Sequence, residues 1–386
     1  MGDPRGFARV LESPIVNKIR EKTSATRNAL LGSLTFQRWA SALPLTRPVA
    51  QRRAREVFDL CAGFVYSQIL YACVKLQLFQ LLSGGARNLS QISSALNLAP
   101  EPTRRLLDAA AALKLVERFG ADRYGLGPHG AVIAGNPGIL KMIEHHAMLY
   151  ADLSDPVALL RGERKDAALS SYWAYATSTS ATDLADARIS EYTALMAASQ
   201  TLIAEEILAT YPIAQHRCLM DVGGGDGTFV RAVAAKIPSI ELKVFDLPAV
   251  AECARQKFAS AGISQRATAH GGNFFCDPLP EGADLISLVR IIHDHDDEPV
   301  RKLFSQVRRA LRPGGKLIVA EPMSGSRRAE TVGDAYFGFY LMAMGSGRPR
   351  SASEIISMLQ REGFTSAREI RTRMPLQTSL IVTEVS

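Results

Sequence analysis

The sequence predicts an α/β fold with a mostly parallel sheet in its second half, preceded by a smaller and largely helical domain. Two observations carry this prediction. From about residue 213 onward, strand-like and helix-like segments alternate, which is the pattern of a parallel sheet with helical connections. Before that point the apolar segments have helical spacing, and a single short hairpin stands among them. At 386 residues the chain is long enough for two domains.

Four strands are expected in the sheet, the first of them buried. They lie at 217–222, 240–247, 283–292 and 316–323. Between the last two, apolar residues recur at three- and four-residue spacing, which predicts an amphipathic helix ending near Leu311. The two β-rich runs at 364–372 and 378–386 are joined closely enough to form an antiparallel pair at the sheet edge.

The first half follows the plan of a winged helix. Apolar helices are predicted at 65–82 and 101–116, on either side of a short helix, and the hairpin after them turns at Gly120–Asp122. The second helix offers few polar side chains for reading DNA bases, so we predict a structural role and no nucleic-acid partner. Residues 1–60 add further helical material, expected to be a dimerisation arm.

The composition is typical of a globular protein whose cysteines are reduced thiols. Its five cysteines are scattered and form no CxxC motif, which argues against disulfides and a zinc cluster and favours the cytoplasm. No uncharged apolar run approaches the roughly 18 residues of a membrane span. Part of the net charge of +7 gathers at Arg47, Arg52, Arg53 and Arg55. A solvated helix face is the simplest explanation; an anionic membrane surface or nucleic acid is the alternative.

The segment DVGGGDG, residues 221–227, follows the first predicted strand and opens a helix. Gly223 and Gly225 let the backbone approach a ligand closely at the carboxyl edge of the sheet. Their spacing is G-x-G-x-G, unlike the G-x-G-x-x-G of pyrophosphate-binding dinucleotide folds. Asp221, at the strand tip, can accept hydrogen bonds from this loop or from a ligand amine.

Two further segments suggest what the loop binds. Asp246 ends the second strand about 20 residues beyond the loop, where a carboxylate can accept both hydroxyls of a ribose; a helix cap is the alternative. In HGGNFF, Asn273 can meet an adenine edge and Phe274 its face. A ribose and an adenine without pyrophosphate suggest S-adenosylmethionine. The predicted cofactor-binding residues are Asp221, Gly223, Gly225, Asp246, Leu247, Asn273 and Phe274.

The segment HDHDD, residues 293–297, combines two histidines with three aspartates. A metal site is one interpretation, but no third and fourth ligand is evident elsewhere, and we predict none. The acidic residues, Asp294 among them, are expected to be solvated and to favour the N-terminus of the next helix. His293 leaves an apolar strand at the carboxyl edge, so we predict a general base. Glu321, on the neighbouring strand, can orient its imidazole; a cap or surface carboxylate is the alternative.

The segment DAYFGFYLMAMG, residues 334–345, is dense in aromatic and Met side chains. Its predicted members are Tyr336, Phe337, Phe339, Tyr340, Met342 and Met344. A core helix is the default explanation, but such a stripe also suits a long hydrocarbon ligand. We therefore predict a substrate tunnel, to which Tyr172, Trp173 and Tyr175 contribute. The predicted substrate-binding residues are Tyr336, Phe339, Tyr340, Met344 and Trp173.

Together these motifs resemble the class I S-adenosylmethionine-dependent O-methyltransferases of the caffeic acid and hydroxyindole type. The resemblance covers about residues 60–386 and rests on DVGGGDG, VFDLP, GGNFF, RIIHDHDDE, LRPGGKLIVAE and GRPRSASEIISMLQREGF. It implies a Rossmann-like catalytic domain after a winged-helix dimerisation domain. Within the family the chain is most similar to bacterial enzymes that methylate the 1-hydroxyl of acyclic carotenoids of the hydroxyneurosporene or demethylspheroidene type. RWASALPLTRPVAQRRAREVFDLCAGFVYSQ and DAYFGFYLMAMGSGRPRS carry this narrower likeness.

The resemblance also assigns residue roles. It implies cofactor contacts from Gly223, Asp246, Asn273 and Phe274, and a general-base role for His293. Two positions depart from the family pattern. Asn273 stands where an Asp is usual, which keeps an acceptor and loses a charge, and His295 stands where a Trp usually packs near the adenine.

The expected organisation follows from these observations. We predict an N-terminal extension at 1–60, a dimerisation domain with a lid-like segment (168–189) at 61–195, and a catalytic domain at 196–386. The expected partners are a hydrophobic carotenoid and a second copy of the chain, bound through the N-terminal domain. The expected location is the cytoplasm, with peripheral contact to the inner membrane as an alternative, because the arm is basic and the substrate dissolves in lipid.

Three other functions stay open at this point. The acceptor can be a phenol or a polyketide. Alternatively, the enzyme can be a relative, from photosynthetic bacteria, that methylates a carbon atom of a tetrapyrrole. A winged-helix regulator that senses S-adenosylmethionine is the non-enzymatic alternative.

Overall fold

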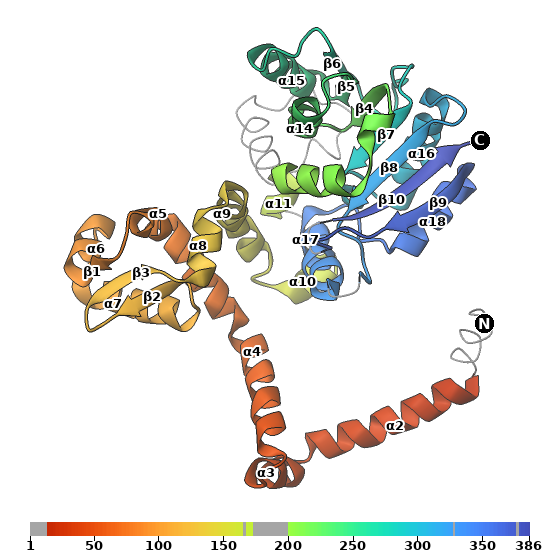
Figure 1. Cartoon of the computed structure of the whole chain (residues 1–386). Coiled ribbons are helices and arrows are strands. Elements are labelled where there is room, and N and C mark those ends of the chain that lie inside the picture. The colour runs from red at the N-terminus through yellow and green to blue at the C-terminus, as the bar shows by residue number, and fades with distance from the viewer. Residues whose placement is uncertain (1–13, 165–166, 173–199, 327–328, 376–377) are drawn as a thin grey trace.

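A computed structural model describes residues 14–164, 167–172, 200–326, 329–375 and 378–386 (Figure 1). Its C-terminal half is built on a seven-stranded sheet with the order β6-β5-β4-β7-β8-β10-β9. The strands are β4 (Cys218–Val222), β5 (Glu241–Asp246), β6 (Ala267–Gly271), β7 (Leu285–Val289), β8 (Lys316–Glu321), β9 (Phe364–Ile370) and β10 (Ser379–Val385). Only β10 runs antiparallel to its neighbours β8 and β9. The predicted mostly parallel sheet with an antiparallel pair at its edge is confirmed.

Helices cover both faces of this sheet. They include α14 (Thr228–Lys236), α15 (Pro248–Ser260), α16 (Asp297–Ala310) and α18 (Ala352–Arg361). Successive residues of a strand point to opposite faces, so Leu219 of β4 belongs to one hydrophobic core and Met220 to the other. Both cores consist of buried side chains, with partly buried apolar residues packed against them.

Two predicted helices need correction, and one strand was missed. The helix predicted at 65–82 is two helices, α4 (Arg47–Lys75) and α5 (Leu78–Ser83), because Gln77 takes a left-handed conformation with φ 55°. The helix predicted at 101–116 is α7 (Pro100–Ala112), after which the chain turns into a strand. The strand β6 was not predicted, because its sequence ATAHG has little apolar or β-branched content to mark it.

The N-terminal domain has the expected winged-helix plan. Its three-stranded sheet has the order β1-β3-β2, with β1 (Arg87–Asn88), β2 (Val116–Phe119) and β3 (Arg123–Leu126). Helices α5, α6 (Leu89–Leu96), α7 and α8 (Pro128–Ala134) surround it. The predicted turn between β2 and β3 is confirmed, and Gly120 provides the positive φ of 68° that this turn requires.

Helices α2 (Pro14–Gly32), α3 (Leu34–Ala42) and the first half of α4 project away from the rest of the molecule (Figure 1). Ala40 is the one residue between 14 and 56 that is buried, among those whose exposure is described. Contrary to the expectation from the sequence, one helix within the described ranges, α4, is long and apolar enough to cross a membrane by length and composition, which alone is weak evidence for a span.

A group of helices connects the two halves. It contains α9 (Pro137–Asp152), α10 (Pro156–Leu160), α11 (Ala168–Tyr172), the π-helix η4 (Thr331–Tyr336) and α17 (Phe337–Met344). Their apolar side chains form a separate core. Of the predicted lid at 168–189, the first residues form α11, and residues 173–189 lie outside the described residues, as does the predicted domain boundary at 195.

Candidate active site

The glycine loop lies directly after β4, as predicted. Gly223 and Gly225 have φ values of 71° and 59°, which favour glycine, and a Cβ on Gly225 would meet no atom within 4 Å. Asp221 below the loop is buried. Its Oδ1 accepts a hydrogen bond of 2.7 Å from Ser287, and its Oδ2 has no partner among the described residues. Burial, partly offset by the Ser287 bond, raises the pKa of Asp221 to about 7.

Asp246 ends β5 and reaches back to the glycine loop. Its Oδ2 accepts a hydrogen bond of 2.7 Å from Gly225 N, and its Oδ1 accepts one of 2.7 Å from Leu247 N. Burial raises the pKa of Asp246 to about 6 despite these bonds. The carboxylate therefore does cap the local backbone. Each oxygen keeps a second lone pair that can accept a ribose hydroxyl.

The segment after β6 gathers three rings. Phe274 lies 4.6 Å from Phe275 and 5.7 Å from His295 between ring centroids, and Phe275 lies 4.9 Å from His295. Burial and the nearby His293 lower the pKa of His295 to about 4, so it is a neutral ring at neutral pH. The Asn273 side chain accepts a hydrogen bond of 2.9 Å from Phe275 N, which fixes the turn. His295 thus supplies an aromatic ring beside Phe274, as the Trp that is usual at this position in the family would.

His293 and Glu321 come together as predicted, because His293 follows β7 and Glu321 ends the neighbouring parallel strand β8. Glu321 Oε1 accepts hydrogen bonds of 2.9 and 2.8 Å from Ile291 N and Ile292 N. Its Oε2 is paired with His293 Nδ1. The carboxylate is thereby fixed at three points, and the pairing at Nδ1 directs Nε2 away from Glu321.

Asp294 corrects one prediction. It is not a solvated neighbour of the base but is buried, with its Oδ1 3.1 Å from His293 Nε2. The reason is local: Ile292–Asp294 form the 3-10 turn η3, which carries Asp294 inward before α16 begins. Burial raises the pKa of Asp294 to about 6, although His293 lowers it. Burial in turn lowers the pKa of His293, but Asp294 and Glu321 outweigh it and the net direction is upward.

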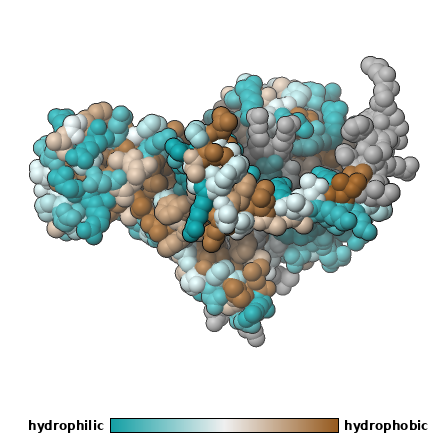
Figure 2. Space-filling view, turned by 90° about the horizontal axis from the view of Figure 1, so that it is seen from below, coloured by the Kyte–Doolittle hydropathy of each residue, from teal (hydrophilic) through white to brown (hydrophobic). Residues whose placement is uncertain are grey.

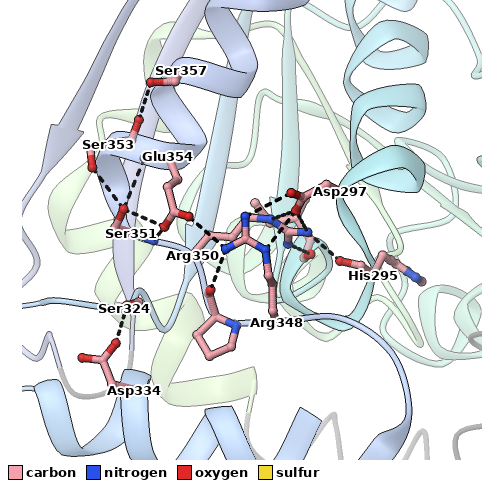
Figure 3. A network of polar contacts seen from close by, with 12 residues as sticks. His295, Asp297, Ser324, Asp334, Arg348, Arg350, Ser351, Ser353, Glu354 and Ser357 are labelled. Atoms are coloured by element: carbon pink, nitrogen blue, oxygen red, sulfur yellow. Dashed lines mark hydrogen bonds and ion pairs between the residues drawn. The ribbon is translucent and has the colours of Figure 1, made fainter. Parts of the chain in front are cut away.

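Arg350 holds this loop in place (Figure 3). Although it is only 2% exposed, its guanidinium donates to Ile292 O at 2.6 Å, to His295 O at 2.8 Å and to Asp297 Oδ1 at 2.7 Å. It therefore binds the backbone on both sides of His293 and Asp294. Gly347 lies against the same turn, where a Cβ would come within 2.1 Å of His293 O. The segment GRPRS, residues 347–351, thus packs against the HDHDD segment and holds its backbone by hydrogen bonds.

The predicted substrate residues lie partly together. Tyr336 and Tyr340 face α9, where their hydroxyls lie 2.7 and 2.8 Å from Nε2 of His146 and His145. Met344 is buried in the same core, whereas Phe339 is 36% exposed and does not belong to it. The Phe337 ring is 5.6 Å from the His293 ring, which connects this aromatic group to the base. Trp173 and Tyr175 lie outside the described residues, and no side-chain position is described for Tyr172.

Several residues around this site were not predicted from the sequence. Arg290, directly before this site, has a left-handed backbone with φ 58°, and its charge lowers the pKa of His293 and Asp294. The adjacent histidines His145 and His146 in an apolar segment were a usable signal. Arg350 gave none, because its partners lie more than 50 residues away in sequence. Among the described residues, no group of three or more His, Cys, Asp or Glu side chains could hold a metal ion.

The fold and site together define a methyltransferase-type α/β enzyme, with a nucleoside site at the glycine loop and a carboxylate-supported histidine beside it. Comparison with known proteins agrees. Residues 150–365 match the family model of the O-methyltransferase domain, and residues 58–134 match that of the O-methyltransferase dimerisation domain. The chain belongs to this O-methyltransferase family.

Curated relatives cover most of the chain. Demethylspheroidene O-methyltransferase of Cereibacter sphaeroides is 45% identical over 337 residues, which are 87% of this chain and 88% of that protein. The protein of the same name from Rhodobacter capsulatus is 41% identical over 89% of this chain and 85% of its own length. Human N-acetylserotonin methyltransferase in complex with SAM has the same fold, with a TM-score of 0.72 at 22% identity over 86% of this chain and 98% of that one.

Proposed function

We propose that the protein methylates the 1-hydroxyl group of an acyclic carotenoid, with S-adenosylmethionine as the methyl donor. The observation that carries this proposal is the 45% identity, over 87% of the chain, to a demethylspheroidene O-methyltransferase. The aromatic and Met side chains of α17 beside the base support it, because a long hydrocarbon needs an apolar lining with few polar groups.

The cofactor site fits the parts of S-adenosylmethionine. Asp221 has a buried oxygen that lacks a partner among the described residues, so it can accept a hydrogen bond from the amino group. Asp246 can accept the ribose hydroxyls, and the rings of Phe274 and His295 can pack against the adenine. When bound, this cofactor supplies a methyl group on a positively charged sulfur and leaves as S-adenosylhomocysteine.

His293 receives the proton of the acceptor hydroxyl. Its Nδ1 is paired with Glu321, so Nε2 is the nitrogen that can take the proton of the O–H group. Because Nε2 lies 3.1 Å from Asp294 Oδ1, the acceptor hydroxyl has to approach it beside this carboxyl group. With the cofactor bound, its methyl group would pass to the acceptor oxygen with S-adenosylhomocysteine as the leaving group, while the hydroxyl proton moves to Nε2. Glu321 then stabilises the imidazolium that results.

Magnitudes indicate how much the base contributes. An alcohol ionises about as reluctantly as water, with a pKa of ~15.7, which is roughly nine units above that of free His at ~6.5. Full deprotonation before transfer would cost on the order of 12 kcal/mol. His293 therefore takes the proton as the methyl group moves. Orientation of the reactants can supply about 7–11 kcal/mol, so the fixed geometry of this loop contributes more than basicity.

The direct test is methyl transfer from labelled S-adenosylmethionine to three acceptors: a 1-hydroxy acyclic carotenoid, a simple phenol and a bacteriochlorophyllide, each with and without EDTA. We expect label in the carotenoid ether, unaffected by EDTA. Label only in another acceptor would overturn the substrate assignment while keeping the enzyme class, and loss of activity with EDTA would overturn the metal-free mechanism.

We also propose that two copies associate through the dimerisation domain. The middle of α4, where the matched region begins, exposes large apolar side chains that water solvates poorly. They are Val57 at 61%, Phe58 at 63%, Leu60 at 84% and Phe64 at 72% exposure. Light scattering on the purified chain should give twice the mass of one chain, and a stable monomer would contradict this proposal.

A further inference from the structure

The positive charge of the chain is concentrated in one place. Residues 14–56, which we call the basic arm, hold nine Lys and Arg against two Glu. Their surplus of seven equals the net charge of +7, because the rest of the chain contains 36 basic and 36 acidic residues. A charge that is segregated in this way creates a local field to which anionic partners respond.

The basic arm also exposes apolar side chains. Trp39 is 53% exposed, Leu34 68% and Leu45 93%. The arm comprises α2, α3 and the first turns of α4, and it projects from the molecule (Figure 1). Seen from the side on which it lies, the surface alternates hydrophobic and hydrophilic patches (Figure 2). Apolar and cationic groups are therefore presented together.

The arm differs from the part of α4 that follows it. From Val57 to Val74 the sequence has one charged residue, Asp59, and the family's dimerisation model begins at residue 58. The charges thus stop where the matched dimerisation region starts. An uncharged apolar face suits a second copy of the chain, whereas two arms that each carry a surplus of seven positive charges repel one another.

We propose that the basic arm docks on an anionic lipid surface. Arg52, Arg53 and Arg55, which are exposed, would attract anionic headgroups, and each basic residue near such a surface strengthens binding. Trp39 would enter the boundary between headgroups and acyl chains, where its ring is favoured. Nucleic acid shares the charge preference, but it offers nothing to the exposed Leu34 and Leu45. The inference does not depend on the identity of the methyl acceptor.

The test is co-sedimentation of the full chain with vesicles of phosphatidylcholine, with and without phosphatidylglycerol. We expect binding only to the vesicles that contain phosphatidylglycerol, and weaker binding at about 1 M salt, where screening is strong. The triple variant R52E/R53E/R55E should lose affinity on the order of 100-fold. In a Trp173→Phe variant, Trp39 is the remaining Trp of the chain, and its fluorescence should shift to the blue on binding.

A matched control reverses three exposed basic residues of the catalytic half, K236E/R309E/R361E, and keeps the total charge equal to that of the triple arm variant. It should bind vesicles as the wild type does. Equal loss in both variants, or no preference for phosphatidylglycerol, would overturn the proposal. A wild type that ignores vesicles, combined with an arm variant that changes from dimer to monomer, would assign the arm to the second copy instead. Retention on DNA without vesicle binding would likewise overturn it.

Discussion

The HDHDD loop and the basic arm are both rich in charge, and the fold treats them in opposite ways. In the loop, His293, Asp294 and His295 are each less than 9% exposed, and partners within the chain hold them. In the arm, almost every residue is exposed, and the nearest charges are mostly of the same sign. The buried charged groups of the loop interact with partners within the chain. The exposed charges of the arm remain available to a partner outside the chain.

The largest expected effect comes from removing the buried base. His293→Ala should lower kcat by about 10²–10⁴-fold, which is typical of a lost general base, while residual methyl transfer persists because the reactants are still oriented. Single-turnover kinetics with labelled cofactor would measure this. The cofactor KM should change little, and a kcat at the wild-type level would remove His293 from the mechanism.

The next prediction compares a buried and an exposed arginine that bind the same carboxylate. Both Arg350 and Arg348 bind Asp297, but their side chains are 1% and 43% exposed. Arg350→Met should cost about 3–5 kcal/mol of unfolding free energy, because it leaves the buried carbonyls of Ile292 and His295 without a donor, at about 1–3 kcal/mol each. Arg348→Met should cost about 1 kcal/mol or less. Urea unfolding of both variants measures the difference; equal losses would mean that Arg350 is not the clamp of the loop.

A smaller effect concerns the substrate side. Tyr336→Phe removes the hydroxyl bound to His146 and should cost about 1–3 kcal/mol, seen as weaker binding of long polyenes or lower stability. Phe339→Ala, at an exposed position of α17, is the control and should change either quantity by about 0.5 kcal/mol or less. If truncation of Tyr336, Tyr340 and Met344 left the preference for long polyenes unchanged, the predicted tunnel would be wrong.

The sequence predicted the parts of the site that lie near one another in sequence or on adjacent strands. The glycine loop, Asp246 and the pairing of His293 with Glu321 follow from strand tips at one sheet edge. The position of Asp294 could not be predicted, because a 3-10 turn decides it. Arg350 could not be predicted either, since only the tertiary fold brings it to Ile292 O and His295 O. Strand β6, whose sequence has little β propensity, likewise forms because it pairs with its neighbour β5.

The measurement that tests the catalytic account most directly is the pH dependence of kcat for the wild type and for Asp294→Asn. His293 must be unprotonated to accept the hydroxyl proton, so activity falls as the pH drops through its pKa. Asp294 and Glu321 raise this pKa above the ordinary ~6.5. The wild-type acid limb should therefore lie above that value, and the variant, which lacks one carboxylate charge, should keep its activity to lower pH. Acid limbs at the same pH in both enzymes would contradict a base held and tuned by these two carboxylates.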